Sequence, residues 1–275
     1  MMKRVLDLSS EGIIYSVKSI QYLFLNNRFN KKQKVLVNGS PKTGTTWMLK
    51  LVNSIPGYHG LGNFHGEIER YRTIEPGEVV HGHDWYTTEL SQILKDKDIK
   101  VVLMMRDPRD QLISRVFHIR RDENHIWHEH LKESSLDEAI ELCIEGREGL
   151  PGTRTMVELS QSWFNSEIEI IVVRYEKLVD DPQIELSKVL EYLEMNLPDG
   201  LISAIIKRNQ FERLSRGRKF WDKSRRRGQA DPRSHFRKGI VGDWINYLNE
   251  SQKILFKAVA GDKLIELGYE NDLNW

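Results

Sequence analysis

The segment that most constrains this chain is Gly39–Trp47, because it turns directly from an apolar run into a helical pattern. Residues 34–38 read Lys-Val-Leu-Val-Asn and predict a buried strand, and residues 46–54 predict a helix. In a strand, tight turn and helix arrangement, the N–H groups of the turn and of the helix start converge on one point. The segment therefore predicts a site for a phosphate or sulfate group.

The details of this turn differ from those of a nucleotide hydrolase. Gly39 and Gly44 have P-loop spacing, but Thr45 stands where a lysine would follow the second glycine, and Lys42 is the lysine within the turn. The strand predicted at 99–105 is followed by Arg106 and not by the acidic residue that would hold magnesium. These residues favour a second anionic group over a metal ion.

Strand and helix patterns alternate along the chain. We expect strands at 34–38, 79–82, 99–105 and 168–174, and helices at 11–26, 46–54, 108–121, 135–146, 155–165, 183–195, 199–208 and 249–267. Near-continuous Val, Ile and Leu strands in such an alternation predict an α/β fold with a parallel sheet covered by helices on both faces. Ligands of these sheets bind beyond the carboxyl ends of the strands, where Gly39, His83, Arg106 and Arg174-Tyr175 would emerge.

The composition is that of a soluble globular protein. The 275 residues suffice for one large α/β domain or two small ones, and we find no interdomain linker. The single cysteine, Cys143, excludes an internal disulfide and fits a reducing, cytoplasmic compartment. The apolar run 13–25 is interrupted by Lys18 and is too short to span a bilayer. We interpret it as an amphipathic helix packed on the domain, with peripheral membrane contact as the alternative.

A basic segment follows the last predicted strand. Residues 207–238 contain thirteen Lys or Arg and three Asp or Glu, whereas the whole chain has a net charge of +1. Turn formers and few aliphatic residues predict a long loop. It is either a solvated surface or a flap over 208–240 that closes on an anionic ligand. A nucleic-acid surface is a third reading, but no recognised nucleic-acid-binding motif accompanies it, and we expect no such partner.

Two further motifs contain anion-binding side chains. In Arg106–Ser114, Pro108 suits the first turn of a helix, and Arg106 and Ser114 would offer a guanidinium and a hydroxyl to one phosphate, unless the turn is only a salt-bridged cap. In Arg237–Trp244, two cations precede Gly239, so side chains and backbone amides can reach one anion. Trp244 would anchor this end of the flap.

Together the three motifs resemble those of the cytosolic-type sulfotransferase family over residues 34 to 270. Pro41–Trp47 resembles its 5′-phosphosulfate loop, Arg106–Ser114 its 3′-phosphate motif, and Arg237–Trp244 its C-terminal cofactor motif. The resemblance implies one domain over 1–275, with 1–33 as a helical extension. It also implies a three-layer sandwich with a central parallel sheet, like that of P-loop nucleotide kinases. The donor would be 3′-phosphoadenosine 5′-phosphosulfate (PAPS), which leaves the bisphosphate PAP, and no metal would be needed.

The resemblance also assigns residues to the donor. The 5′ end would be held by the loop residues Pro41, Lys42, Thr43, Gly44, Thr45 and Thr46, while Trp47 would stack on the adenine. The 3′-phosphate would be bound by Arg106, Ser114, Arg237, Lys238 and Gly239, and the adenine by Tyr175 and Phe211.

The family's catalytic base is a histidine that leaves a strand, and this chain has two candidates. His83 aligns best, whereas His81 falls where animal members have a lysine near the sulfuryl group. A neutral imidazole can take the proton of an acceptor hydroxyl as the oxygen attacks sulfur. Lys42 would neutralise the charge that develops on the leaving oxygen.

The acceptor is less constrained by the sequence. We expect a hydroxyl, less often an amine, on a small-molecule, sugar or lipid-like compound. Segments 57–75 and 118–135 should line its pocket, with Tyr58, His59, Phe64, His65, Tyr71, Trp127 and His128.

The sequence also leaves two alternative functions open. The alternatives to a sulfotransferase are a kinase-like phosphoryl transferase and a non-catalytic anion-binding module of the same fold. His118, His125, His128 and His130 lack a recognised metal-ligand pattern, so structural or acceptor-site roles are expected for them. The family's dimerisation segment is not recognisable at 249–253, and no oligomeric state follows from the sequence.

Overall fold

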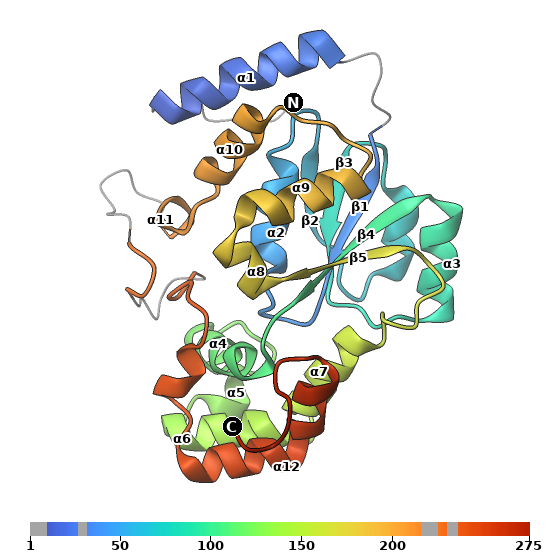
Figure 1. Cartoon of the computed structure of the whole chain (residues 1–275). Helices are drawn as coiled ribbons and strands as arrows, with labels where there is room; N and C mark the ends of the chain where they lie inside the picture. Colours follow the sequence, from blue (N-terminus) through green and yellow to red (C-terminus); the bar gives the residue numbers. More distant parts are fainter. Residues whose placement is uncertain (1–9, 27–31, 216–224, 230–235) are drawn as a thin grey trace.

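The computed structural model describes residues 10–26, 32–215, 225–229 and 236–275. At its centre lies a five-stranded parallel sheet with the strand order β2-β3-β1-β4-β5 (Figure 1). The strands are β1 Lys34–Asn38, β2 His59–Asn63, β3 Glu78–His81, β4 Ile99–Met105 and β5 Ile170–Arg174. The predicted α/β fold with a parallel sheet is confirmed.

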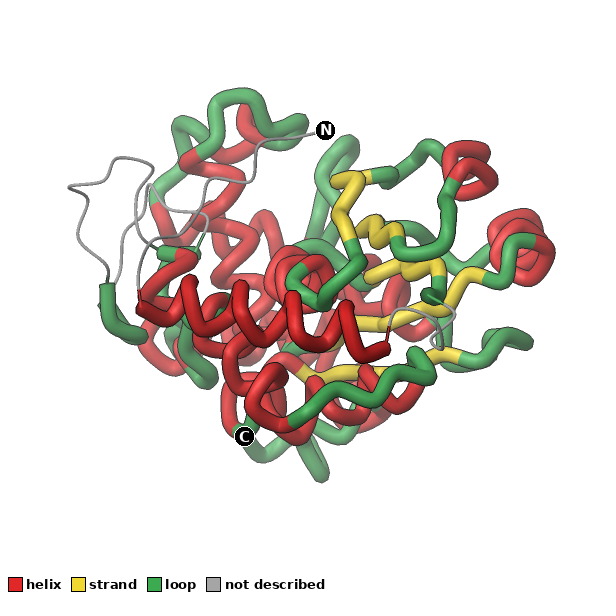
Figure 2. Tube along the Cα trace, turned by 90° about the horizontal axis from the view of Figure 1, so that it is seen from above, coloured by secondary structure: helices red, strands yellow, loops and turns green. Residues whose placement is uncertain are grey.

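Helices cover both faces of the sheet, as the view from above shows (Figure 2). The α-helices within the described residues are α1 Ser10–Asn26, α2 Thr45–Asn53, α3 Thr88–Asp96, α4 Pro108–Arg121, α5 His128–Leu131, α6 Leu136–Glu145, α7 Thr153–Gln161, α8 Tyr175–Asp180, α9 Pro182–Tyr192, α10 Asp199–Arg208, α11 Phe211–Leu214 and α12 Glu250–Glu266. Two short 3-10 helices, η1 Ile68–Thr73 and η2 Asp243–Asn246, complete the set. Side chains alternate along β1, so Val35 and Val37 pack with α2, α9 and α10, while Leu36 packs with α3 and η1.

A separate helical cluster lies beyond the carboxyl end of β4. Helices α4, α6 and α12 enclose a second core around Ile113 and Phe256 there, and α7 packs against all three helices (Figure 1). Because α4 follows β4 after only two residues, this cluster holds the Arg106–Ser114 motif against the sheet edge.

The starts of several helices follow from local sequence signals. Asp107 caps α4 by accepting a hydrogen bond from the Arg109 N–H, and Pro108 occupies its first turn. Ser135 with Glu138, and Asn249 with Gln252, form capping boxes at α6 and α12. These starts lie within two residues of those that the sequence predicts.

Strand β2 and helix α3 were not predicted from the sequence, and neither were the short helices α5, α8, α11, η1 and η2. Strand β2 reads His-Gly-Leu-Gly-Asn and lacks the apolar run of the central strands; it pairs with β3 at the sheet edge, with a register shift between Gly60 and Gly62. Helix α3 buries Leu90, Ile93 and Leu94 at helical spacing, and the pattern was not recognised. The strand expected at 168–174 begins at Ile170.

The N-terminal helix α1 packs on the domain as expected. Tyr15 and Tyr22 are buried, and the Tyr15 hydroxyl donates a 2.5 Å hydrogen bond to the Ser54 carbonyl. Lys18 Nζ donates to the Gly200 carbonyl at 2.9 Å, which ties α1 to α10. The opposite side of α1 is apolar and exposed at Ile13, Ile14, Val17 and Ile20. None of the helices in the described part of the chain is both long and apolar enough to cross a membrane.

Candidate active site

Four strands end next to one cavity of about 330 Å³. Strands β1, β3, β4 and β5 run in parallel, so Gly39, His83, Arg106 and Tyr175 follow them at one edge of the sheet. The cavity is lined by every residue that the sequence assigned to the donor or to catalysis, apart from Thr43 and His81. Thr43 is buried beneath the loop, where its hydroxyl donates to the Ser40 carbonyl at 2.7 Å.

The loop between β1 and α2 is held in an unusual backbone conformation. Lys42 has a φ of 75°, a left-handed value that costs energy in a residue with a side chain and is common at ligand-binding turns. Gln111 of α4 braces the loop by donating to Ser40 Oγ at 2.6 Å and to the Pro41 carbonyl at 2.8 Å. No side chain caps the start of α2, and its first turn contains no acidic residue. The helix N-terminus therefore remains available to an anion.

Lys42 is the cation closest to this helix start in sequence, and its pKa lies near physiological pH. Burial, and then the positive charges of Arg121, Arg106 and Arg237, lower the pKa of Lys42 from its ordinary value to about 7. An anionic ligand would reverse the effect of the neighbouring cations. Lys42 can therefore gain a proton when such a ligand binds.

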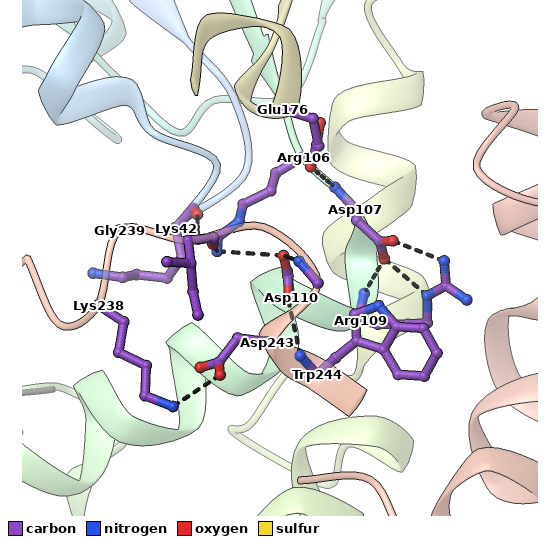
Figure 3. A network of polar contacts seen from close by, with 12 residues as sticks. Lys42, Arg106, Asp107, Arg109, Asp110, Glu176, Lys238, Gly239, Asp243 and Trp244 are labelled. Carbon is purple, nitrogen blue, oxygen red and sulfur yellow. Dashed lines mark hydrogen bonds and ion pairs between the residues drawn. The ribbon is translucent and has the colours of Figure 1, made fainter. Parts of the chain in front are cut away.

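Arg106 links the loop to the C-terminal motif. Its guanidinium donates to the Lys42 carbonyl at 3.4 Å and to the Ile240 carbonyl at 3.2 Å, and it lies 4.3 Å from the centre of the Tyr175 ring. The carboxylate of Asp110 lies 3.6 Å away (Figure 3). Asp110 also accepts hydrogen bonds from the backbone of Gly242 at 2.8 Å and of Trp244 at 3.0 Å. One buried carboxylate thus joins the second and third motifs.

Arg237 and Lys238 both pair with Asp243. The distances to its carboxylate oxygens are 2.6 Å from Arg237 and 2.8 Å from Lys238, whose bond Figure 3 shows. Burial raises the pKa of Asp243, but the hydrogen bonds from Lys238 and Arg237 outweigh it and leave the pKa below its usual range. The cations of the third motif are therefore held in place at the cavity before any ligand binds.

Among the described residues, three buried guanidinium nitrogens have no hydrogen-bond partner: one is Nε of Arg115, outside the cavity lining, and the other two face the site. These two are Nε of Arg106 and Nε of Arg237, both in residues that line the cavity. A buried donor without an acceptor costs about 1–3 kcal/mol. Two such donors from separate motifs fit a site that a phosphate group completes.

Aromatic rings form the other wall of this part of the cavity. Trp47 donates through its indole N–H to the Asn209 carbonyl at 2.9 Å and meets Tyr175 edge-on at 5.9 Å. Gly239 has a φ of 68°, and a Cβ there would overlap the ring of Phe211. Arg227, which the sequence analysis did not assign, lies 5.2 Å from the Trp47 ring centre and lines the same cavity. These rings fit a flat heterocycle.

His83 presents an unprotonated nitrogen to this cavity. Its Nδ1–H donates to the Gly39 carbonyl at 2.6 Å, which leaves a lone pair on Nε2. Burial lowers the pKa of His83 to about 4, against the opposing effect of the Gly39 hydrogen bond. The ring is therefore neutral at physiological pH, and its Nε2 lone pair is free to take a proton.

His81 is placed differently. It is the last residue of β3, and its Nδ1 is buried without a partner. Its ring contacts the backbone of Gly62 in β2, and burial lowers its pKa. Because the ring turns towards β2, His81 does not line the cavity, although its centre lies 5.9 Å from that of His83.

Comparison with known proteins places this geometry in a family. Residues 32–268 match the model of the sulfotransferase domain family. The chain belongs to this family. Cytosolic sulfotransferase 14 of Arabidopsis thaliana is 28% identical over 94% of this chain and 83% of the relative, and cytosolic sulfotransferase 15 of the same plant is 26% identical over 92% and 79%.

Solved structures share the fold. The mouse sulfotransferase SULT7A1, crystallised with PAP, superposes with a TM-score of 0.66 at 21% identity, covering 92% of this chain and 90% of that one. Retinol dehydratase, crystallised with retinol and PAP, superposes with a TM-score of 0.62 at 19% identity, covering 90% and 85%. The predicted sulfotransferase family and its P-loop type of fold are confirmed.

The far end of the cavity in this sulfotransferase differs from the predicted acceptor pocket. Its lining includes Asn63, His65, His118, His125, Ile126 and Trp127. Of the residues expected there, His65 and Trp127 are present, whereas Tyr58, Phe64 and Tyr71 are buried in the hydrophobic core. His59 lies outside the cavity, where it bonds Glu78. His128 is bound to the Ile119 carbonyl at 2.9 Å and also lies outside it. Aromatic residues in a polar context were wrongly assigned to the pocket because they fill the core beneath it.

The described part of the basic segment folds back on the third motif. Arg225 donates to the carbonyls of Phe236 and Arg237, each at 2.6 Å, and Arg227 donates to that of Gly239. Residues 216–224 and 230–235 of the predicted flap lie outside the described residues.

Among the residues that are described, no three His, Cys, Asp or Glu side chains are grouped as a metal site.

Proposed function

We propose that this sulfotransferase transfers the sulfuryl group of PAPS to a hydroxyl, or less often an amine, of a small-molecule, sugar or lipid-like acceptor. The observation that carries the proposal is the pair of unpartnered donors, Nε of Arg106 and of Arg237, beside the uncapped start of α2. The two donors form one anion site and the start of α2 forms another in the same cavity. A nucleotide with charged groups at both its 3′ and 5′ positions requires two such sites. The PAP in the crystals of two proteins of this fold supports the same donor.

In this proposal the 3′-phosphate is bound by Arg106, Ser114, Arg237, Lys238 and the backbone of Gly239. The 5′ end is bound by the backbone of Pro41–Thr46 and by Lys42, and the adenine lies among Trp47, Tyr175 and Phe211. The domain boundaries belong to the proposal: one unit over 1–275, with the extension 1–33 and the flap 208–240. Cytoplasmic location is supported by the names of the plant relatives.

His83 acts as the general base. PAPS supplies an activated sulfuryl group, and the acceptor oxygen forms a bond to its sulfur while the bond from sulfur to the bridging phosphate oxygen breaks. The acceptor proton passes to Nε2 of His83, because Nδ1 already holds a hydrogen that it donates to Gly39. Lys42 in its ammonium form stabilises the negative charge on the leaving phosphate oxygen.

Two alternatives are less well supported. A kinase-like phosphoryl transferase needs an acidic metal ligand after the neighbouring strand, where this chain has Arg106. A non-catalytic module does not need a buried neutral imidazole at the anion site.

Peripheral membrane contact would use the exposed apolar side of α1, at Ile13, Ile14, Val17 and Ile20. Cosedimentation with phosphatidylserine vesicles would detect such contact.

A paired substitution tests the base. With labelled PAPS and a panel of phenols, alcohols, sugars and amines, His83→Ala should reduce turnover at least 100-fold, the usual scale for general-base loss. Affinity for PAP should stay within about twofold, since the imidazole acts on the acceptor. His81→Ala is the control, because His81 lies outside the cavity. Loss of turnover in His81→Ala with activity kept in His83→Ala would move the base to His81.

A further inference from the structure

Two pairs of histidines line the cavity. His65 follows β2, His83 follows β3, His118 lies in α4 and His125 lies between α4 and α5, and all four line the cavity. The ring centres of His65 and His83 are 5.9 Å apart, and those of His118 and His125 are 5.1 Å apart. The proposed mechanism uses only His83.

The hydrogen bonds at Nδ1 fix what the other rings present. His118 Nδ1 accepts a hydrogen bond from Arg121 at 2.7 Å, and His125 Nδ1 accepts one from the Trp127 backbone at 3.1 Å. In a neutral ring that accepts at Nδ1, the hydrogen lies on Nε2. These two imidazoles therefore carry N–H donors, which suit oxygen atoms of a ligand.

His65 is held by a carboxylate that is itself fixed. The Asn63 side chain accepts from its backbone N–H at 3.0 Å, and its Nδ1 donates to Asp84 Oδ1 at 3.1 Å. Asp84 is itself fixed by the Tyr71 hydroxyl at 2.5 Å and by the Gly66 N–H at 2.9 Å. The side chain of His65 is 52% exposed, so Nε2 is the ring nitrogen left for a ligand. The hydrogen bond to Asp84 raises the pKa of His65, which favours an imidazolium that donates from Nε2.

The charges in the cavity favour a negative ligand. Asp243 is the single carboxylate among the described residues that line the cavity, and it is paired with Arg237 and Lys238. Asp84 lies behind His65 and is satisfied by three hydrogen bonds. Ile126, which is 81% exposed, and Trp127 add an apolar surface to the same cavity.

We propose that His65 binds an oxyanion of the acceptor, so that the acceptor is an acidic hydroxyl compound whose anionic group lies near the hydroxyl that is sulfated. This inference rests on the proposed function, which leaves the acceptor open. The separation of the rings of His65 and His83 allows one small molecule to place its anion on the first and its hydroxyl on the second, each through a hydrogen bond of about 2.8 Å.

The test compares matched ligands on the PAP-loaded protein at pH 6.5. Calorimetry measures the affinity for 3- and 4-hydroxybenzoate, and each acid is compared with its uncharged amide. 4-Hydroxybenzenesulfonate is measured as an acid with a different anionic group. We expect at least one acid to bind about tenfold more tightly than its neutral counterpart, which is the scale of a charge-assisted hydrogen bond. His65→Ala should abolish this preference.

His59→Ala is a closely matched control. His59 is 59% exposed and also pairs with a carboxylate, Glu78, at 3.1 Å, but it lies outside the cavity, so the preference should persist. Asp84→Asn should weaken the preference. The proposal would be overturned if acid and amide bound equally in every pair, or if no ligand of the panel bound. It would also be overturned if the preference for the acid survived in His65→Ala. Failure of the proposed function would instead appear as loss of PAP binding by the unsubstituted protein.

Discussion

At the scale of single residues, Lys42 makes nucleotide binding depend on pH. Its pKa of about 7 in the free protein means that it is protonated below pH 7 and neutral above it. Since the ammonium form binds the anion, affinity for PAP should be highest at low pH and fall as the pH rises through 7, by up to tenfold per pH unit. Calorimetry at pH 8 in buffers of different ionisation enthalpy should show uptake of about one proton.

Substitution separates this effect from general electrostatics. Lys42→Met should remove most of the proton uptake, whereas Lys50→Met, in helix α2 just after the loop but outside the cavity lining, should preserve it. Proton uptake that is equal in both variants would assign the titration to another group.

Residue roles were predictable where a motif contains them. Arg106, Ser114 and His83 lie at fixed positions relative to strand ends, so the sequence places them in the cavity. The pairing of His65 with Asp84 was not predictable, because the 3-10 helix η1, strand β3 and their loops separate the two residues and no short pattern marks the contact. The core positions of Tyr58, Phe64 and Tyr71 likewise depend on packing that polar neighbours obscure.

At the scale of elements, the short helix α11 and the third motif depend on each other through one glycine. Gly239→Ala should displace Phe211 and lower PAP affinity at least tenfold, because the added Cβ overlaps the ring. Gly242→Ala is the matched control. Gly242 has a similar φ of 76°, so both variants carry the same backbone cost of about 1–2 kcal/mol, but its Cβ would meet no atom within 4 Å. Equal losses of affinity would mean that backbone strain alone matters.

The strands at the centre of the sheet were predictable from their apolar runs. Strands β1 and β4 are continuous apolar runs, and their predicted bounds hold. Strand β2 could not be recognised, because a Gly-rich edge strand is stabilised by the ladder of its neighbour and not by its own side chains.

At the scale of the whole molecule, the basic segment should respond to the nucleotide. Arg225 and Arg227 bond to backbone carbonyls at 236–239, next to the cations that the proposal assigns to the 3′-phosphate. PAP would neutralise part of this positive field and stabilise the segment. Trypsin cleavage at residues 225–227 should therefore slow several-fold with PAP. Cleavage at Arg147, in an exposed turn away from the cavity, should not change. Equal slowing at both places would indicate general stabilisation.

The junction of β1 with the loop after β3 has a consequence for how such a chain can diversify. The Asn38 side chain donates to the Asp84 carbonyl at 2.9 Å and accepts from the Asp84 N–H at 3.0 Å. These two bonds extend the hydrogen bonding between the two segments beyond the end of β1. The loop that the proposal assigns to the donor is thereby joined to the residue next to His83. His65 is tied to the same junction through Asp84, whereas Ile126 comes from the separate segment between α4 and α5. Evolution or engineering can therefore exchange the segment around 122–127 to change the acceptor without disturbing the junction beside His83.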